Sequence, residues 1–428
     1  MRILIISMVP QRDWLIDSMI ADAVKEKGHE VFLRKFLSDD RTAVIFERPD
    51  VAVIPVIRCE YTRDLAIRLR QWGVRIVSRR SEAGVSRKQY EKLPRHWQLD
   101  HIGRYDYKDL IDLELIWSSE FADILVEEGK IRREQAKVIG AITLDPYFKW
   151  NLQKYSHKVF TKDKSEWLTE KDLDPNKKTL YFITGFVHAE RTEYTLPEAP
   201  IGDPIHKELY DRDRRLRDLW FKAIERIVAT GTYNIIVRPH HGENLSFWSS
   251  LNGNTRVSTE GSAGESLFYS DLMVHSGSTM AIEAHLFNKP ALRFGNTAQD
   301  ELIGRISPQC EDVPELIESI DSIDFDNTNA NISEISDLEK SFFGPIDGKA
   351  HQRAADAICE TEPTQTSIPL EWPEEELNDY SSEGIIKIDS RYRIIYCNAC
   401  KKASQNETGG FAYRCPHCGI TITNESKE

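Results

Sequence analysis

Residues 274 to 294 read VHSGSTMAIEAHLFNKPALRF, in which small hydroxyl side chains stand between an apolar run and a carboxylate. The pattern predicts a strand, a turn, a helix of about three turns and a second strand. A helix N-terminus at the end of a parallel strand can bind phosphate, and a carboxylate one turn later can accept hydrogen bonds from a ribose. The same residues also fit a helix cap followed by a solvated charge. The candidate binding residues are Ser276, Gly277, Ser278, Thr279 and Glu283.

Two further strand ends carry candidate ligand contacts. The strand that ends in VRPHH places Arg238 and His240 at its carboxyl end, where their positive charge could neutralise a bound phosphate. Gly185 follows the apolar run TLYFIT and leaves room for a ligand. The alternatives are strand-end histidines that bond the backbone and a plain turn glycine.

A carboxylate directly follows a predicted strand in the first half of the chain. Glu82 lies in SEAG, after the strand VRIVSR, where it could act as a general base. Its neighbours Arg79 and Arg80 equally allow an ion pair, or a site that holds an anionic acceptor. Asp13, in the segment QRDW after the first strand, is the reserve candidate.

Four of the seven cysteines form two CxxC pairs, separated by 14 residues. Four thiolates at this spacing predict a closed tetrahedral zinc site with a structural role, and so small a module needs the metal to fold. A redox dithiol is the alternative. The predicted zinc ligands are Cys397, Cys400, Cys415 and Cys418. The other three, Cys59, Cys310 and Cys359, are expected to be reduced packing residues.

Alternating apolar and amphipathic segments position these groups. Residues 1–155 predict one doubly wound α/β domain, and the alternation restarts over 176–358 after a charged surface connector. Residues 360–384 form an acidic, Pro-rich linker, and 385–428 the small β module with the cysteines. The expected fold class is therefore two Rossmann-like domains followed by a zinc ribbon.

The net charge and the short motifs limit the classes of function that the protein could have. The net charge of -13 argues against a nucleic-acid partner. Residues 63–104 hold 11 Lys or Arg against 4 Asp or Glu, which fits an anionic acceptor, a membrane surface or a solvated face. The apolar run at the N-terminus is too short to span a bilayer and is interpreted as a core strand of a cytoplasmic protein. A D-x-D at 211–213 begins a charged helix and is interpreted as a solvated face.

The stretch S-G-S-T-x-x-x-E-A-x-x-x-x-K-P-A-L resembles the nucleotide-binding signature of GT-B glycosyltransferases and nucleotide-sugar epimerases. More narrowly, the chain is similar to bacterial surface carbohydrate biosynthesis proteins and to capsule-type sialyl and Kdo transferases. VRPHH stands where their H-P motif would, with the proline before the histidines, and SEAG where their acidic-Gly motif would, with Ala83 inserted. The resemblance covers about residues 1–358.

The resemblance implies a metal-independent, inverting GT-B glycosyltransferase. The second domain would hold a nucleotide-sugar donor, and the first a glycan or lipid-linked acceptor of surface polysaccharide. Such an enzyme would act in the cytoplasm, with residues 63–104 available for peripheral contact with the inner face of the membrane. Two alternatives stay open: a nucleotide-sugar epimerase of the same fold, and a nonenzymatic zinc-ribbon adaptor that binds a nucleotide.

Overall fold

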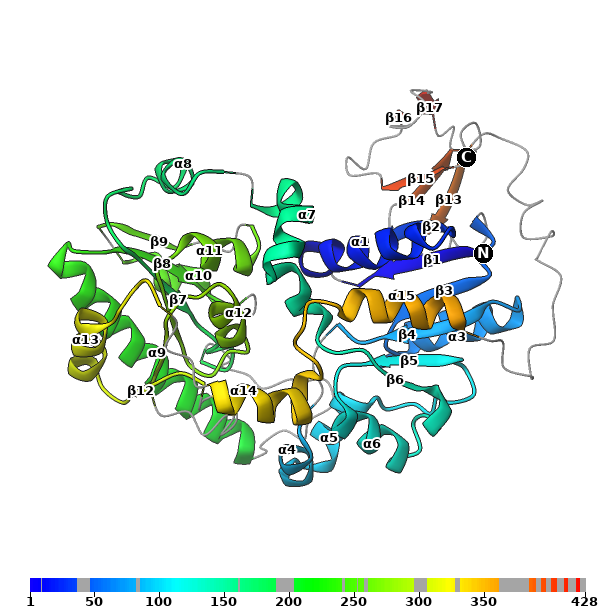
Figure 1. Ribbon diagram of the computed structural model, residues 1–428, viewed down its shortest axis with the longest axis horizontal. Helices are drawn as coiled ribbons and strands as arrows, with labels where there is room; N and C mark the ends of the chain where they lie inside the picture. Colours follow the sequence, from blue (N-terminus) through cyan, green and yellow to red (C-terminus); the bar gives the residue numbers. More distant parts are fainter. Residues whose placement is uncertain are drawn as a thin grey trace, which may run out of the picture. The chain divides into compact units, whose positions relative to one another are not determined.

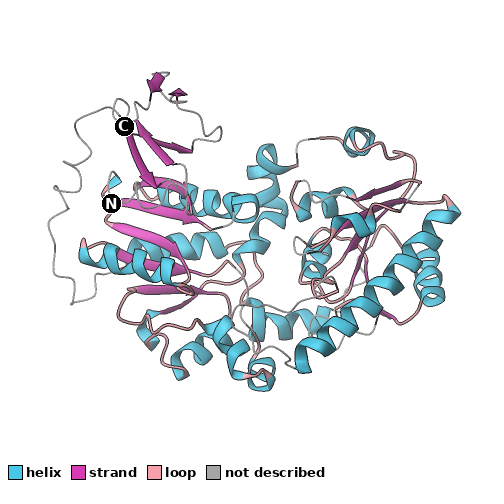
Figure 2. Ribbon diagram, turned by 180° about the vertical axis from the view of Figure 1, so that it is seen from behind, coloured by secondary structure: helices cyan, strands magenta, loops and turns pink. Residues whose placement is uncertain are grey.

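The structure is a computed structural model in which two compact units can be followed (Figures 1 and 2). Unit 1 comprises residues 1–146 and the chain from 339 onward, and unit 2 comprises 147–338. The residues described are 1–8, 10–36, 47–81, 85–160, 162–189, 204–240, 243–251, 253–257, 261–295, 306–327, 332–361, and five short strands beyond residue 384.

Unit 1 is built on a six-stranded sheet of order β2-β1-β3-β4-β5-β6, with every pair parallel. Its strands are β1 (Arg2–Ser7), β2 (Glu30–Lys35), β3 (Val51–Pro55), β4 (Arg75–Arg79), β5 (Leu113–Ile116) and β6 (Ala136–Val138). Its helices are α1 (Pro10–Glu26), α3 (Glu60–Gln71), α4 (Arg87–Lys92), α5 (Arg95–Ile102), α6 (Ser119–Glu127) and α15 (Ala350–Glu360), with short helical turns η1 (Arg133–Gln135), η2 (Ile142–Tyr147) and η4 (Glu339–Phe343).

Both faces of this sheet are buried, which explains its nearly continuous apolar strands. Alternate residues of a strand serve opposite faces: Ile3 and Ile5 pack under α1, whereas Leu4 and Ile6 pack with α3 and α6. The predicted α/β domain at the N-terminal end of the chain is therefore confirmed, with helices on both sides of a parallel sheet.

Helix α15 returns to unit 1 after the whole of unit 2. Its alanines and Ile358 are buried on the sheet face that α1 also covers, and α1 and α15 lie side by side (Figure 1). Arg353 fixes the helix by donating from Nε to the Ile139 carbonyl at 2.6 Å. We expected residues up to 358 to belong to the second domain, but the small apolar face of this helix fits the first sheet.

Unit 2 repeats the architecture with a six-stranded parallel sheet of order β12-β11-β10-β7-β8-β9. Its strands are β7 (Thr179–Ile183), β8 (Asn234–Arg238), β9 (Thr255–Val257), β10 (Leu272–His275), β11 (Ala291–Phe294) and β12 (Gln309–Cys310). Its helices are α7 (Lys149–Val159), α8 (Lys164–Glu170), α9 (Pro204–Thr230), α10 (Leu245–Trp248), α11 (Ala263–Tyr269), α12 (Met280–Leu286), α13 (Val313–Ser322) and α14 (Ile332–Leu338).

The core of unit 2 lies between this sheet and the long helix α9, where Trp220 is fully buried beside Phe182 and Phe294. The segment before β7, expected to be a surface connector, instead contributes to the unit. Helix α8 buries Trp167 and Leu168, because its two adjacent apolar residues pack against α11 while its charges face outward.

Five strands follow at the C-terminal end: β13 (Ile385–Asp389), β14 (Ile394–Cys397), β15 (Lys402–Gln405), β16 (Ala412–Arg414) and β17 (Thr421–Thr423). They form antiparallel pairs, as expected for a small β module. The acidic linker at 362–384 lies outside the described residues. Among the residues that the structure describes, no helix has the length and apolar character that crossing a bilayer requires.

Candidate nucleotide site in unit 2

The strand order of unit 2 reverses between β7 and β10, because the chain passes from β7 outward to β9 and then crosses to the other side of β7. In open parallel sheets, ligands bind at the carboxyl ends of the strands at such a switch point. Arg238, Ile183 and His275 end β8, β7 and β10 and are aligned across the sheet. The segments that carry the candidate binding residues therefore leave the sheet side by side.

Gly185 and Ser276 flank this switch point. A Cβ built on Gly185 would lie 4.0 Å from the Ser276 hydroxyl oxygen, so the two segments approach each other closely without conflict. Arg238, one strand away, donates from its guanidinium to the Gly261 carbonyl at 2.9 Å, and His240 is exposed after the end of β8. The structure thus brings together Gly185, Arg238, His240 and the turn at 276–279; His241 lies outside the described residues.

His275 shapes the hydroxyl-rich turn. Its Nδ1 accepts from the backbone N–H groups of Gly277 and Ser278, both at 3.1 Å, so its proton is on Nε2, which donates to the Ser307 hydroxyl at 2.9 Å. Burial, helped by the positive charge of Arg293, lowers the pKa of His275 to about 3 and keeps the ring neutral. Gly277 has φ 120, a conformation that favours glycine.

This arrangement changes the expected phosphate contacts. We expected the backbone N–H groups of the turn to bind phosphate, but two of them are directed to the imidazole of His275. The Ser278 hydroxyl accepts from Met280 N at 3.2 Å, whereas Thr279 makes no side-chain cap of α12. The N–H groups of Gly277 and Ser278 thus already have an acceptor within the protein, and the hydroxyl groups of the turn are the further candidate donors.

Glu283 lies one turn into α12 and is not a solvated charge. Burial raises its pKa to about 7, although a hydrogen bond from the Tyr147 hydroxyl acts in the opposite direction. A second buried tyrosine, Tyr181, lies close enough for the carboxylate to raise its pKa, and its hydroxyl donates to the Ala263 carbonyl at 3.3 Å. The carboxylate is thus largely withdrawn from water, where a hydroxyl donor is worth more than in bulk solvent.

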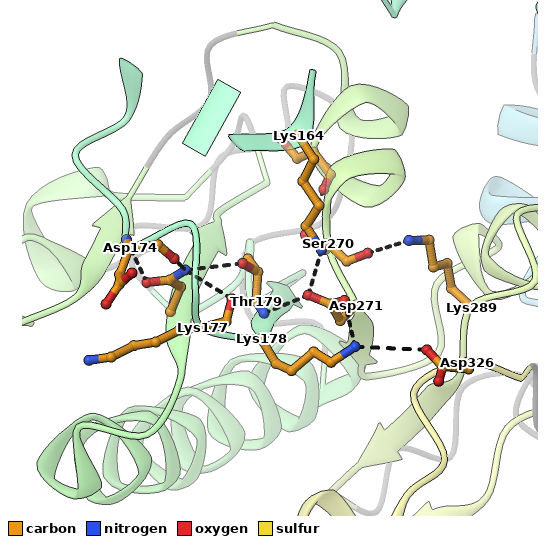
Figure 3. Close-up of polar contacts among 11 residues, drawn as sticks. Lys164, Asp174, Lys177, Lys178, Thr179, Ser270, Asp271, Lys289 and Asp326 are labelled. Atoms are coloured by element: carbon orange, nitrogen blue, oxygen red, sulfur yellow. Dashed lines mark hydrogen bonds and ion pairs between the residues drawn. The ribbon is translucent and has the colours of Figure 1, made fainter. Parts of the chain in front are cut away.

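The far end of α12 is fixed to the sheet. Asn288 ends the helix in the left-handed conformation at φ 55, as expected from the sequence. Lys289 donates from Nζ to the Ser270 carbonyl at 2.7 Å, beside Asp271, whose carboxylate accepts from Thr179 N and Lys164 Nζ (Figure 3). These contacts lie at the amino ends of β7 and β10 and hold the helix that carries Glu283.

Glu243 is a buried acid that the sequence did not single out. One carboxylate oxygen accepts from the Thr184 hydroxyl at 2.6 Å and from His240 N at 2.9 Å, and the other accepts from Trp248 Nε1 at 3.3 Å. Burial raises its pKa, and these donors oppose that effect. Glu243 therefore ties the ends of β7 and β8 together. Its only sequence signal was an acidic residue two positions after the histidine pair.

Unit 1 carries the two candidates for the general base, Glu82 and Asp13. Glu82 lies outside the described residues. Its neighbours Arg79 and Arg80 are buried and form ion pairs with Asp17 at 2.8 Å and Glu114 at 2.7 Å. The expectation that they could hold an anionic acceptor is therefore corrected: carboxylates within unit 1 already neutralise them. The reserve base Asp13 is fully buried in the first turn of α1.

Of two charged segments, only the D-x-D at 211–213 differs from expectation. Within 63–104, many of the basic residues form ion pairs inside unit 1, including Arg70 with Asp112 and Arg87 with Glu127. In the D-x-D segment, Asp213 is buried and accepts from His188 N at 3.1 Å, so it anchors a loop and is not part of a solvated face.

The cysteines can be placed only through the strands that flank them. β14 ends at Cys397, which pairs with Lys402, so the first CxxC lies in the connection between two antiparallel strands. Arg414 pairs with Thr421, and the second CxxC lies in the connection between them. Cys400, Cys415 and Cys418 lie outside the described residues. Cys310 is buried, Cys359 half-buried and Cys59 exposed, and all three are free thiols.

No protein-family model matches the chain, and no curated protein does. Solved structures are similar over most of it. A UDP-GlcNAc 2-epimerase from Methanocaldococcus jannaschii is 14% identical with a TM-score of 0.54, covering 84% of this chain and 99% of that one. An epimerase of the same kind from Neisseria meningitidis, bound to UDP-GlcNAc, is 13% identical with a TM-score of 0.51, covering 84% and 100%.

The wall teichoic acid polymerase TagF is also similar, at 12% identity and a TM-score of 0.50, covering 83% of this chain and 88% of that one. At such identities the likeness establishes the fold alone. The chain therefore has the two-unit α/β architecture of GT-B proteins, as the resemblance in its sequence implied.

Proposed function

We propose that this protein is an enzyme that acts on a nucleotide sugar. The observation that supports it best is the alignment of Gly185, Arg238 and the turn at 276–279 at the switch point of unit 2, beside the buried carboxylate of Glu283. Hydroxyl donors and a guanidinium suit phosphate, and a carboxylate suits a ribose. The GT-B fold, shared with proteins whose structures hold UDP-GlcNAc or UDP, agrees with this proposal.

The reaction proposed is transfer of the sugar to a glycan or lipid-linked acceptor of a surface polysaccharide, at the cytoplasmic side of the membrane. Glu82 would take the proton from the acceptor hydroxyl while Arg238 and His240 neutralise the departing nucleotide, so that no divalent metal is needed. Glu82→Gln should then lower turnover by about 10²-fold or more and leave donor affinity near that of wild type. Turnover that survives this change would exclude Glu82 as the base.

Epimerisation is a second candidate, because several of the similar structures are UDP-GlcNAc 2-epimerases. The two reactions differ in their need for an acceptor. Incubating the protein with UDP-GlcNAc alone and following the sugar by NMR should show inversion at C2 if it is an epimerase. A transferase should leave the sugar unchanged until an acceptor glycan is added.

The donor can be identified by thermal-shift measurements with CMP-, UDP-, GDP- and CDP-linked sugars. We expect one of them to raise the melting temperature, because a ligand that binds only the folded protein stabilises it. If none does, the nucleotide-sugar proposal fails, and the adaptor alternative fails with it.

We also propose that Cys397, Cys400, Cys415 and Cys418 bind one structural zinc ion. Bound zinc would hold the two hairpins together with all four positions filled by thiolate, which leaves none for catalysis. Metal analysis of the purified protein should find one zinc per chain, and Cys415→Ser should release it. A chain without zinc that keeps a folded C-terminal module would contradict the proposal.

A further inference from the structure

Tyr147 places its side chain at the carboxylate proposed to hold the ribose. It is the first residue of unit 2 and the last of η2, and its ring meets Phe287 edge-on, with centroids 5.0 Å apart. Phe287 follows Glu283 by one helical turn, so the tyrosine covers the face of α12 that carries the acid. Its hydroxyl donates a hydrogen bond to the Glu283 carboxylate.

The backbone of α11 leaves room for this ring. A Cβ built on Gly264 would lie 2.4 Å from the Tyr147 hydroxyl oxygen and 2.7 Å from Cε1, both far closer than atoms can approach. A side chain at this position would therefore push the hydroxyl away from its present place beside the acid. The contact between Tyr147 and Glu283 is therefore built into two segments of unit 2 that are more than 100 residues apart in sequence.

The chemistry of the pair fixes which group donates. Burial and the neighbouring carboxylate raise the pKa of Tyr147 well above its ordinary value, so its hydroxyl keeps the proton. Glu283 accepts the hydrogen bond from this hydroxyl. Without it, the buried carboxylate would lack a donor, which is costly.

We propose that Tyr147 is a specificity-determining residue of the nucleotide site, because its hydroxyl satisfies the carboxylate that a ribose hydroxyl must reach. This inference rests on the proposed function. When a ribonucleotide binds, Glu283 exchanges the tyrosine hydroxyl for a ribose hydroxyl. When the sugar lacks hydroxyls, the tyrosine stays and the carboxylate remains satisfied. Tyr147 therefore reduces the preference for ribose.

The test compares dissociation constants at pH 8 for UDP, CDP, GDP and CMP, each with its 2′,3′-dideoxy form. For the nucleotide that binds, we expect wild type to prefer ribose by only a few-fold. In Tyr147→Phe, a bound dideoxynucleotide leaves the Glu283 carboxylate without a donor. The variant's preference for the ribonucleotide over the dideoxy form should therefore be about 10-fold larger than that of wild type, or more. The phenyl ring keeps the packing on Phe287.

Gly264→Ala is a second way to separate the tyrosine hydroxyl from Glu283, because the added methyl group must push the ring aside. This variant should increase the ribose preference as Tyr147→Phe does. Tyr181→Phe is the matched control: it also removes a buried hydroxyl near Glu283, but that hydroxyl donates to a backbone carbonyl. Its ribose preference should equal that of wild type.

Equal preference for ribose in wild type, Tyr147→Phe and Gly264→Ala, with clear nucleotide binding in each, overturns the role of Tyr147 and leaves the nucleotide site standing. If none of the nucleotides binds wild type or Tyr147→Phe, the nucleotide site and the role of Tyr147 fail together. A larger preference in the Tyr181→Phe control as well would assign the effect to general loosening of the pocket and reject the specific role.

Discussion

Burial of Glu283 has a direct consequence for the chemistry of the site. Its pKa of about 7 compares with an ordinary value of 4.5, so the folded protein keeps a proton that the unfolded chain releases. Stability from this group is fully present below pH 4.5 and is lost as the pH rises through about 7. The site therefore destabilises unit 2 under the conditions in which the ionised carboxylate can bind a ribose.

We expect Glu283→Gln, which is always neutral, to be more stable than wild type at pH 8 by about 3 kcal/mol, and to match it near pH 4.5. Urea unfolding of both proteins across this pH range measures the difference. Parallel stability curves for the two proteins between pH 5 and 8 would show that the acid ionises normally.

Loss of the same acid should weaken ligand binding. Glu283→Ala is expected to reduce the binding free energy of the donor nucleotide by about 1 to 3 kcal/mol, because a charge-assisted hydrogen bond to the ribose is lost. Arg238→Ala should weaken binding of the nucleotide but not of the free nucleoside, since it acts on phosphate. Calorimetric titration separates the two effects, and affinities unchanged in both variants would move the nucleotide elsewhere.

At the scale of elements, the sequence predicted what periodicity and caps determine. The two α/β alternations, the strand before Ser276, and a helix that stops before Asn288 all follow from apolar period and turn chemistry, although α12 has about two turns and not the three expected. The roles of His275, Glu243 and Tyr147 could not be predicted in this way. Each depends on a partner brought near by strand order or by distant packing, and no local pattern records that proximity.

The turn between β10 and α12 depends on a neutral imidazole. Replacing His275 with Leu leaves two N–H groups without their acceptor and should lower the free energy of unfolding by about 2 to 4 kcal/mol. His275→Asn supplies an oxygen near the position of Nδ1 and should recover much of this loss. Chemical denaturation of the three proteins at pH 8 checks the order; equal losses in both variants would mean that packing, not hydrogen bonding, is at stake.

The imidazole also predicts acid sensitivity. Because the pKa of His275 falls from 6.5 to about 3 on folding, its contribution to stability is present above pH 6.5 and is lost as the pH falls toward 3. His275→Asn has no such group and should therefore lose less stability than wild type between pH 6.5 and pH 4. Acid unfolding followed by circular dichroism measures this.

At the scale of the whole molecule, the two units differ in continuity. Unit 2 is one uninterrupted segment, whereas unit 1 needs α15, which follows it in the chain. We expect the fragment 147–338 to fold alone, because its core is formed by its own residues. It should show a cooperative thermal transition and bind the donor nucleotide; a fragment that stays unfolded would show that unit 2 depends on unit 1.

Truncation after Leu338 should leave unit 1 incompletely folded. Loss of α15 exposes the sheet face that holds Ile3, Ile5 and Val53, and the remaining chain should bind hydrophobic dyes and aggregate. A chain that ends at Thr361 keeps the helix and serves as the control, with its nucleotide affinity unchanged. A soluble, cooperatively folded 1–338 chain would contradict this expectation.

The return of α15 also sets an order of assembly during translation. A ribosome that has synthesised residues 1 to 338 has made everything unit 2 needs and has left the first sheet with one face uncovered. The domain encoded second can thus be completed first, while the domain encoded first remains open until its last helix leaves the exit tunnel. Slow elongation across 339–361 would prolong that exposed state, so codon choice in this short stretch should affect the yield of soluble protein more than the same change made within unit 2.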